Sequence, residues 1–195
     1  MFYKESERVD KDCTESDCKL DWRKKMNLEN WIRDVPDFPK KGIVFKDITP
    51  LLKDATAFRY VVDVLTEKYR DKGVEVVVAA EARGFILGAP LAYNLGAAFV
   101  PVRKPVKLPA AVISVQYALE YGVDSIEMHK DAISPGQKVL IIDDLLATGG
   151  TVAATIELVE KLGGDIIGVA FLIELTFLNG RRKLKDYEVL SLIQY

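Results

Sequence analysis

Apolar runs alternate along the chain with stretches whose apolar residues recur every three or four positions. Runs of this kind are typical of strands buried on both faces. They occupy residues 74–80, 98–102, 139–142, 166–172 and 189–193. The periodic stretches predict helices that begin near Asp54, Phe85 and Thr151 and pack one apolar face on the strands. The alternation predicts an α/β fold with a doubly wound, mainly parallel sheet and helices on both faces.

Two parts of the chain depart from this alternation. Residues 28–35 predict a short helix, after which Pro36 and Pro39 force an extended path. Residues 108–124 form a long connection with weak apolar alternation, and residues 126–133 predict a further strand or short helix. A connection of this length inside a compact domain is typical of a lid over a site.

Length, composition and charge limit the class of protein and the number of domains. The chain has 195 residues, of which 49% are hydrophobic and 29% charged, and its net charge is −2. These values indicate one globular domain without the basic surface that nucleic acid requires. No apolar run is long enough to cross a bilayer, and the charged N-terminus lacks the apolar stretch of a secretory signal. We expect a flexible extension over residues 1–25 and a single domain over residues 26–195.

Cysteine and histidine exclude some chemistries. Cys13 and Cys18 lie in the extension, at a spacing that fits neither a zinc site nor a CxxC redox motif, so we expect free thiols. His129 is the only histidine, and we expect it at the surface. Because the chain has no second histidine, a Ser–His or Cys–His catalytic pair built on one is excluded.

The strongest chemical motif begins where the run at residues 139–142 ends. There the sequence continues as DDLLATGGT, from Asp143 to Thr151, and then takes on helical periodicity. Glycines at 149 and 150 let backbone N–H groups approach an anion, and a helix N-terminus favours negative charge. Thr148 and Thr151 add hydroxyl donors. The turn therefore favours a phosphate, and because no lysine follows the glycines it is not a nucleoside triphosphate loop.

The two aspartates cannot hold a phosphate, since like charges repel. Asp143 and Asp144 could instead accept hydrogen bonds from two neighbouring hydroxyls, as on the edge of a ribose. A phosphate beside a diol describes a ribose 5-phosphate. The alternative is an ordinary helix start with two solvated carboxylates, and the residues alone leave both interpretations open.

Basic residues follow two other predicted strands. Arg83 comes just after the run at residues 74–80, and its guanidinium fork suits phosphate oxygens. The run at residues 98–102 is followed by a basic cluster of three residues, Arg103, Lys104 and Lys107. A second anion contact and an ordinary solvated surface are both compatible with this cluster.

Five segments, in the same order, resemble the adenine-specific members of the type I phosphoribosyltransferase family. They are DFPKKGIVFKDITPLL, AAEARGFILGAPLA, VRKPVKLP, ALEYG and the ATGGT motif with its aspartates. The likeness runs from about Leu28 to Tyr195. It implies the type I phosphoribosyltransferase fold and Mg²⁺-dependent transfer of the 5-phosphoribosyl group from phosphoribosyl pyrophosphate to adenine, which gives AMP and pyrophosphate in purine salvage. It also implies a cytoplasmic homodimer.

Two other functions stay open beside this one. One is a phosphoribosyltransferase for another purine such as xanthine. Ala147 stands where enzymes for 6-oxopurines commonly place an aspartate, which argues against a hypoxanthine–guanine enzyme. The other is a non-catalytic regulator of the same fold that binds phosphoribosyl pyrophosphate, and the retained ALEYG segment and Arg83 argue against it.

The resemblance also implies roles for particular residues. The 5-phosphate would lie on Ala147, Thr148, Gly149, Gly150 and Thr151. Asp143 and Asp144 would lie under the ribose hydroxyls. Pyrophosphate would be bound by Glu81, Ala82, Arg83, Lys104 and Lys107, with a cis peptide bond between the first two of them. No side chain is expected to bind Mg²⁺ directly, because substrate and water would hold it.

The remaining roles belong to two segments over the strand ends. Residues 28–50 would form a small N-terminal hood, in which Phe45 stacks on the purine and backbone groups near Val44 and Lys46 read the adenine edge. The alternative is that Val44 and Phe45 are core residues. A mobile catalytic loop over about residues 104–124 would carry Glu120, which handles the purine's ring proton, and Tyr121 beside it. A solvated loop glutamate is the ordinary alternative. Arg103 would contact the partner chain of the dimer.

Overall fold

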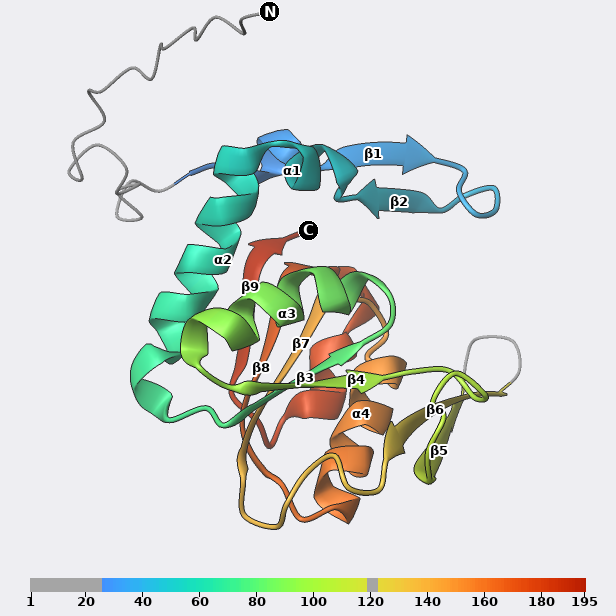
Figure 1. Cartoon of the computed structure of the whole chain (residues 1–195). Coiled ribbons are helices and arrows are strands. Elements are labelled where there is room, and N and C mark those ends of the chain that lie inside the picture. The colour runs from blue at the N-terminus through green and yellow to red at the C-terminus, as the bar shows by residue number, and fades with distance from the viewer. Residues whose placement is uncertain (1–25, 119–122) are drawn as a thin grey trace, which may run out of the picture.

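The computed structural model describes residues 26–118 and 123–195 (Figure 1). At its centre five parallel strands form one sheet in the order β4-β3-β7-β8-β9. The strands are β3 (Val76–Ala80), β4 (Ala98–Val102), β7 (Lys138–Leu146), β8 (Asp165–Glu174) and β9 (Val189–Gln194). Each contains an apolar run that the sequence marks as a buried strand, so the predicted sheet is confirmed.

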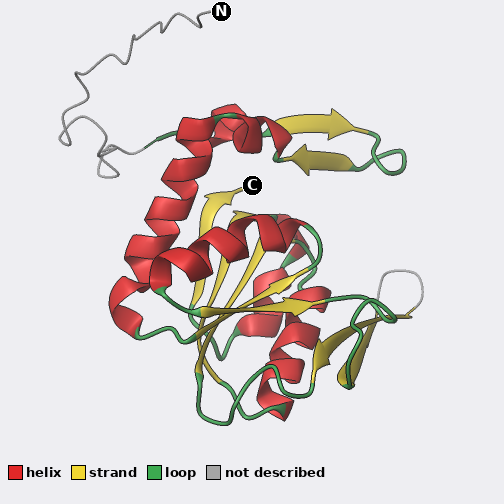
Figure 2. Cartoon of the chain, in the orientation of Figure 1, coloured by secondary structure: helices red, strands yellow, loops and turns green. Residues whose placement is uncertain are grey.

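Helices cover both faces of this sheet, as predicted (Figure 2). They are α2 (Ala55–Tyr69), α3 (Arg83–Leu95) and α4 (Gly150–Lys161). Alternate residues of each strand face opposite layers. Val77, Leu140 and Ile142 pack with α2 and α3, whereas Val76 and Ile141 pack with α4. Within the described residues, no helix is both long and apolar enough to cross a membrane.

The strand order places a crevice between β3 and β7. The chain passes from β3 to its neighbour β4 on one side and later returns to β7 on the other side. At such a reversal the connections after the two strands lead to opposite faces, which leaves a gap outside their carboxyl ends where ligands bind. The motifs at Arg83 and at Asp143 therefore lie at one place.

The start of α2 shows how local sequence sets the helix ends. Asp54 caps the helix, because its carboxylate accepts hydrogen bonds from the N–H groups of Thr56 at 3.0 Å and Ala57 at 2.8 Å. A 3₁₀ turn, η2 (Arg70–Lys72), follows the helix, and Gly73 ends it with a left-handed φ of 68°. The helix predicted to begin near Asp54 is confirmed.

The N-terminal part forms the predicted hood, but the helix predicted over residues 28–35 is wrong. The hood consists of η1 (Leu28–Trp31), β1 (Arg33–Pro36), β2 (Val44–Asp47) and α1 (Thr49–Lys53). Only one 3₁₀ turn forms before the chain extends. Antiparallel pairing with β2 and the ion pair between Arg33 and Asp47, at 2.6 Å, hold the following residues as a strand. Figure 1 shows this hairpin beyond the end of the sheet at which the labelled C-terminus lies.

The connection after β4 is more regular than predicted. Residues 112–118 and 123–129 form an antiparallel hairpin, β5 (Val112–Ala118) and β6 (Val123–His129). Alternate residues such as Val115, Ile126 and Met128 are buried in the core beside α4. The segment predicted as a strand or short helix is therefore a strand. His129 at its end is half-buried, not at the surface as predicted, and its Nε2 accepts a hydrogen bond from the Ala110 N–H at 3.4 Å.

Candidate functional site

Two strand-end motifs meet at the carboxyl edge of the sheet. Arg83 follows β3, and its Nε lies 2.9 Å from Oδ2 of Asp144, which belongs to β7. The contact between the elements is close at Gly84 as well, where a Cβ atom would lie 2.9 Å from Oδ1 of Asp143. The structure thus brings together the arginine and both aspartates that the sequence singles out.

The two carboxyl groups are held in an unfavourable environment. Burial raises the pKa of Asp143 well above its ordinary value, and the charge of Asp144 raises it further. Burial also raises the pKa of Asp144, against the opposing effect of Arg83. Asp144 is 3% exposed, and among the described residues no donor makes a hydrogen bond to its Oδ2, since the contact with Arg83 lacks that geometry. Buried acceptors with unfilled capacity are typical of sites that receive donors from a ligand.

The turn after β7 leaves helix N–H groups available. Gly149 takes a left-handed φ of 75° just before α4, and no side chain caps the helix start. The orphan N–H groups of the first turn can therefore bind an anion. Thr151 donates to the Tyr117 hydroxyl at 3.4 Å, which links the turn to the β5–β6 hairpin. We call residues 147–151 the cradle.

The glutamate of the first motif is bound by the basic cluster. Arg103 donates from Nε to Glu81 at 2.5 Å, and Lys107 also forms an ion pair with Glu81. Burial acts to raise the pKa of Glu81, but hydrogen bonds from Lys107 and Arg103 outweigh it and lower that pKa. The peptide bond between Glu81 and Ala82 is cis, as expected. Glu81 thus joins the end of β3 to the basic segment.

Lys104 occupies a different place from Lys107. Its ammonium lies 3.0 Å from the Asp124 carboxylate on β6, and a hydrogen bond from Lys104 lowers the pKa of that carboxyl. Tyr117 donates to the same carboxylate at 3.4 Å. The charge of Lys104 is therefore paired near the turn end of the β5–β6 hairpin, where Asp124 lies opposite Tyr117.

An aromatic residue of the hood lies above the arginine. The guanidinium carbon of Arg83 is 5.0 Å from the ring centroid of Phe45. Phe38 meets Phe45 edge to face, with centroids 5.2 Å apart. Val44 is 49% exposed and Phe45 is half-buried, so neither behaves as a core residue. The hood thus presents a ring over the crevice.

The side chain of Lys46 is engaged elsewhere. It forms an ion pair with Asp34 at 2.7 Å, and its ammonium lies 3.6 Å from the ring centroid of Tyr195. Only the backbone of Lys46 therefore remains for a ligand in this arrangement. Glu120 and Tyr121, expected in the catalytic loop, lie outside the described residues.

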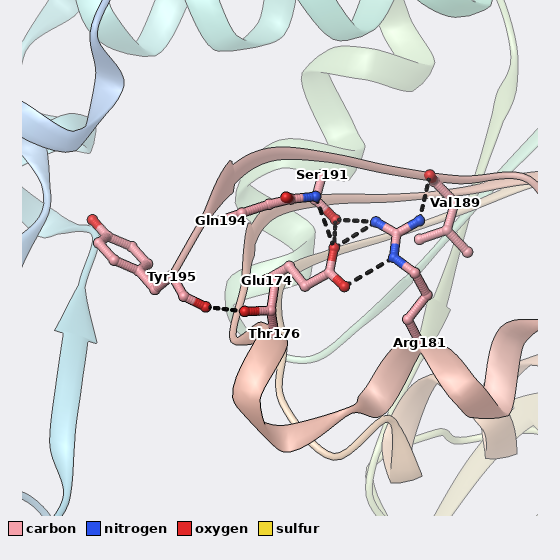
Figure 3. A network of polar contacts seen from close by, with 7 residues as sticks. All are labelled: Glu174, Thr176, Arg181, Val189, Ser191, Gln194 and Tyr195. Atoms are coloured by element: carbon pink, nitrogen blue, oxygen red, sulfur yellow. Dashed lines mark hydrogen bonds and ion pairs between the residues drawn. The ribbon is translucent and has the colours of Figure 1, made fainter.

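A charged network that joins the end of β8 to β9 and to the segment at Arg181 was not singled out from the sequence (Figure 3). Arg181 donates to Glu174 from Nε at 2.9 Å and from a terminal nitrogen at 2.5 Å. Glu174 is only 4% exposed. The available signal was a glutamate at the end of an apolar run, followed by the basic stretch GRRK.

A parallel α/β sheet, an uncapped glycine turn and paired carboxylates at its switch point define the class of phosphoribosyltransferases. The model of the phosphoribosyl transferase domain matches residues 51–194. An adenine phosphoribosyltransferase from Alkaliphilus metalliredigens is 61% identical over 170 residues, which cover 87% of this chain and 100% of that protein. The chain therefore belongs to the adenine phosphoribosyltransferase family, and the family resemblance and enzyme class predicted from the sequence are confirmed.

Solved structures agree with this assignment. The crystal structure of adenine phosphoribosyltransferase from Thermoanaerobacter pseudethanolicus has a TM-score of 0.84 and 58% identity, covering 86% of this chain and 98% of that one. The enzyme from Saccharomyces cerevisiae, solved with an imino-altritol bisphosphate and adenine, has a TM-score of 0.80 and 40% identity over 85% of this chain and 96% of that one. The type I phosphoribosyltransferase fold is thereby confirmed.

Proposed function

We propose that this chain transfers the 5-phosphoribosyl group from phosphoribosyl pyrophosphate to adenine, giving AMP and pyrophosphate. The observation that carries the proposal is the meeting of Arg83 with the Asp143–Asp144 pair, beside the uncapped cradle and under Phe45. One crevice thus offers an anion site, two acceptors for a diol, a cation and an aromatic ring. These are the complements of a 5-phosphate, a ribose, a pyrophosphate and a purine.

Each part of the substrate falls to a separate group of residues. The cradle, Ala147 to Thr151, holds the 5-phosphate with N–H groups and hydroxyls. Asp143 and Asp144 accept hydrogen bonds from the ribose hydroxyls, which fills the vacant acceptor capacity of Asp144. Arg83 faces the pyrophosphate with a fork of donors. Lys107 and Lys104 assist it, once they leave Glu81 and Asp124 respectively.

The reaction breaks the bond between the anomeric carbon and the pyrophosphate oxygen and forms a bond from that carbon to a ring nitrogen of adenine. Positive charge develops on the sugar and negative charge on the leaving group, which Arg83 stabilises. The proton of the attacking nitrogen leaves through Glu120 on the catalytic loop. We assign Glu120 this role, and Tyr121 a place beside it, from the resemblance of ALEYG to the family's loop.

The site suits Mg²⁺ that is bound mainly by substrate and water. Within the described residues, no three histidine, cysteine or acidic side chains are grouped so as to hold a metal. The carboxylates of Asp143 and Asp144 are hard oxygen groups of the kind Mg²⁺ prefers near a sugar diol. Beside Asp143 and Asp144, Mg²⁺ would supply positive charge against the negative charge that develops on the leaving pyrophosphate.

Adenine binds between the hood and the cradle. The ring of Phe45 stacks on the base, and the backbone of Val44 and Lys46 reads its amino edge. Ala147 leaves no carboxylate beside the base, which disfavours a 6-oxopurine. We further propose a cytoplasmic homodimer, in which Arg103 reaches the partner chain after releasing Glu81.

Pyrophosphate release tests this function. Purified protein with phosphoribosyl pyrophosphate and Mg²⁺ is given adenine, hypoxanthine, guanine or xanthine in turn, with a chelator as the metal control. We expect release with adenine alone and none after chelation. Release with xanthine would identify the other transferase, whereas binding of phosphoribosyl pyrophosphate without release for any base would identify a regulator. Sedimentation of an active monomer would refute the dimer.

A further inference from the structure

A short turn after β8 lies directly against the cradle. It comprises η3 (Thr176–Leu178) and η4 (Gly180–Leu184). A Cβ atom at Gly149 would lie 2.7 Å from the carbonyl oxygen of Gly180, and a Cβ atom at Gly180 would overlap the carbonyl oxygen of Ala147. Two backbones thus touch where neither can carry a side chain. The position of Gly180 therefore limits where the cradle can lie.

The turn is held in place by an ion pair with unusually many partners. Besides its two hydrogen bonds to Glu174, Arg181 donates to the carbonyl oxygen of Val189 at 3.0 Å and to Ser191 at 3.3 Å. Glu174 also accepts from Ser191 at 2.7 Å and from Gln194 at 3.4 Å. The hydrogen bond from Arg181 lowers the pKa of Glu174, so the carboxylate is ionised and saturated with donors.

The ion pair is also joined to the strand that leads into the cradle. Glu174 lies opposite Leu146 in the pairing of β7 with β8, and the N–H of Leu175 donates to the carbonyl oxygen of Leu146 at 2.9 Å. Ala147, the first residue of the cradle, follows Leu146 directly. Leu184, at the end of the turn, is buried with Val152 of α4. The turn is thus fastened on both sides of the cradle.

We propose that Gly180 and the Glu174–Arg181 pair are positioning residues that hold the cradle in the shape that binds the 5-phosphate. This inference rests on the proposed role of the cradle. None of the three needs to touch the substrate. Gly180 supplies a surface of backbone without a side chain, and Arg181 and Glu174 hold that surface against the carbonyl oxygen of Ala147.

A comparison of AMP with adenosine isolates this role, because the two ligands differ only in the 5-phosphate. Affinity for both is measured by calorimetry in the wild-type protein and in Arg181→Met, Glu174→Gln and Gly180→Ala. Arg182→Met is the matched control: it removes the same charge from the neighbouring residue, which is exposed. Melting temperatures identify the variants that fold. If Gly180→Ala does not fold, the affinities of Arg181→Met and Glu174→Gln test the inference.

We expect the folded variants to bind AMP about tenfold or more weakly, the equivalent of one charge-assisted hydrogen bond, and adenosine as before. The KM for phosphoribosyl pyrophosphate should rise while the KM for adenine stays constant, and Arg181→Lys should recover part of the loss. Arg182→Met should behave as wild type. An unchanged AMP-to-adenosine ratio in folded Arg181→Met and Glu174→Gln would overturn the inference. A wild-type protein without preference for AMP would instead overturn the cradle itself, and the inference with it.

Discussion

Replacing Phe45 with alanine is the most direct test of how the base is bound. The ring lies in the hood, half-buried, with Arg83 on one side and the edge of Phe38 against it. Because it is tied to the rest of the protein by few contacts, its removal should leave the fold intact. Removal of the ring should mainly lower the affinity for a ligand that stacks on it.

The contacts of Phe45 set the expected losses in adenine affinity and in stability. Stacking of a base on an aromatic ring is worth about 1–3 kcal/mol, so adenine affinity should fall by about 5- to 150-fold. The Phe38–Phe45 pair contributes about 0.5–1.5 kcal/mol and the exposed Arg83 contact about 0.5–1 kcal/mol to the free energy of unfolding. Arg83 keeps its ion pair with Asp144 in the variant. The loss in stability is therefore small beside the loss in base binding.

The assay is steady-state turnover with adenine varied at saturating phosphoribosyl pyrophosphate, and then with phosphoribosyl pyrophosphate varied at saturating adenine. Phe45→Ala should raise the KM for adenine by the factor above and leave the KM for phosphoribosyl pyrophosphate unchanged. Phe45→Tyr keeps the ring and should stay near wild type. Phe38→Ala removes the neighbouring ring and serves as the matched control, with a small effect expected. A wild-type KM for adenine in Phe45→Ala, or an equal loss in Phe38→Ala, would show that Phe45 is not the stacking residue.

Three further predictions concern charge and chain length. Glu120→Gln should lower turnover by about 10²- to 10⁴-fold with nearly unchanged substrate binding, and single-turnover rates equal to wild type would exclude Glu120 as the catalytic acid or base. Asp143→Asn should raise the melting temperature at pH 7 while abolishing most activity. Because the pKa of Asp143 is raised in the folded state, this carboxyl lowers stability increasingly as the pH rises above the ordinary unfolded pKa. The gain should therefore vanish below about pH 4, where the carboxyl is protonated in both states. Deletion of residues 1–25 should leave activity and melting temperature unchanged, because 170 residues of this chain match the whole of a relative, and a marked drop in either would show a role for the extension.

The sheet could be predicted from the sequence because its strands are buried on both faces. A strand such as β3, in which all five residues are buried, must be apolar throughout, and such runs are visible without knowledge of their neighbours. Strand β1 could not be predicted in this way, since its conformation depends on pairing with β2. The β5–β6 hairpin gave only weak alternation, because the polar Asp124 takes a position on the same face of β6 as the buried Ile126 and Met128.

The site residues also divide into those that the local sequence predicts and those that depend on contacts with distant segments. Asp143 and Asp144 lie near the end of β7 and the cradle follows that strand directly, so the sequence itself places them together. The partners of the basic cluster come from elsewhere in the chain: Lys104 pairs with Asp124 across the hairpin. The contact of Gly180 with the cradle likewise joins segments that only the crossing of β8 brings together. Contacts between distant segments leave no periodic pattern, which is why the pairing of Lys104 with Asp124 and the contact of Gly180 could not be predicted from the sequence.

In the proposed site, the hood binds the base, whereas the strand ends of the sheet bind the sugar phosphate. The two parts of the substrate are thus bound by separate segments of the chain. The hairpin of residues 33–47 meets the strand ends through Phe45 over Arg83 and through Lys46 over Tyr195. The residues proposed to bind the sugar and the phosphates lie outside this hairpin, at the carboxyl ends of β3, β4 and β7 and in the connections that follow them. Under the proposed roles, changes in this hairpin and at Ala147 would alter the base that is accepted, while the rest of the donor site at the strand ends would be preserved.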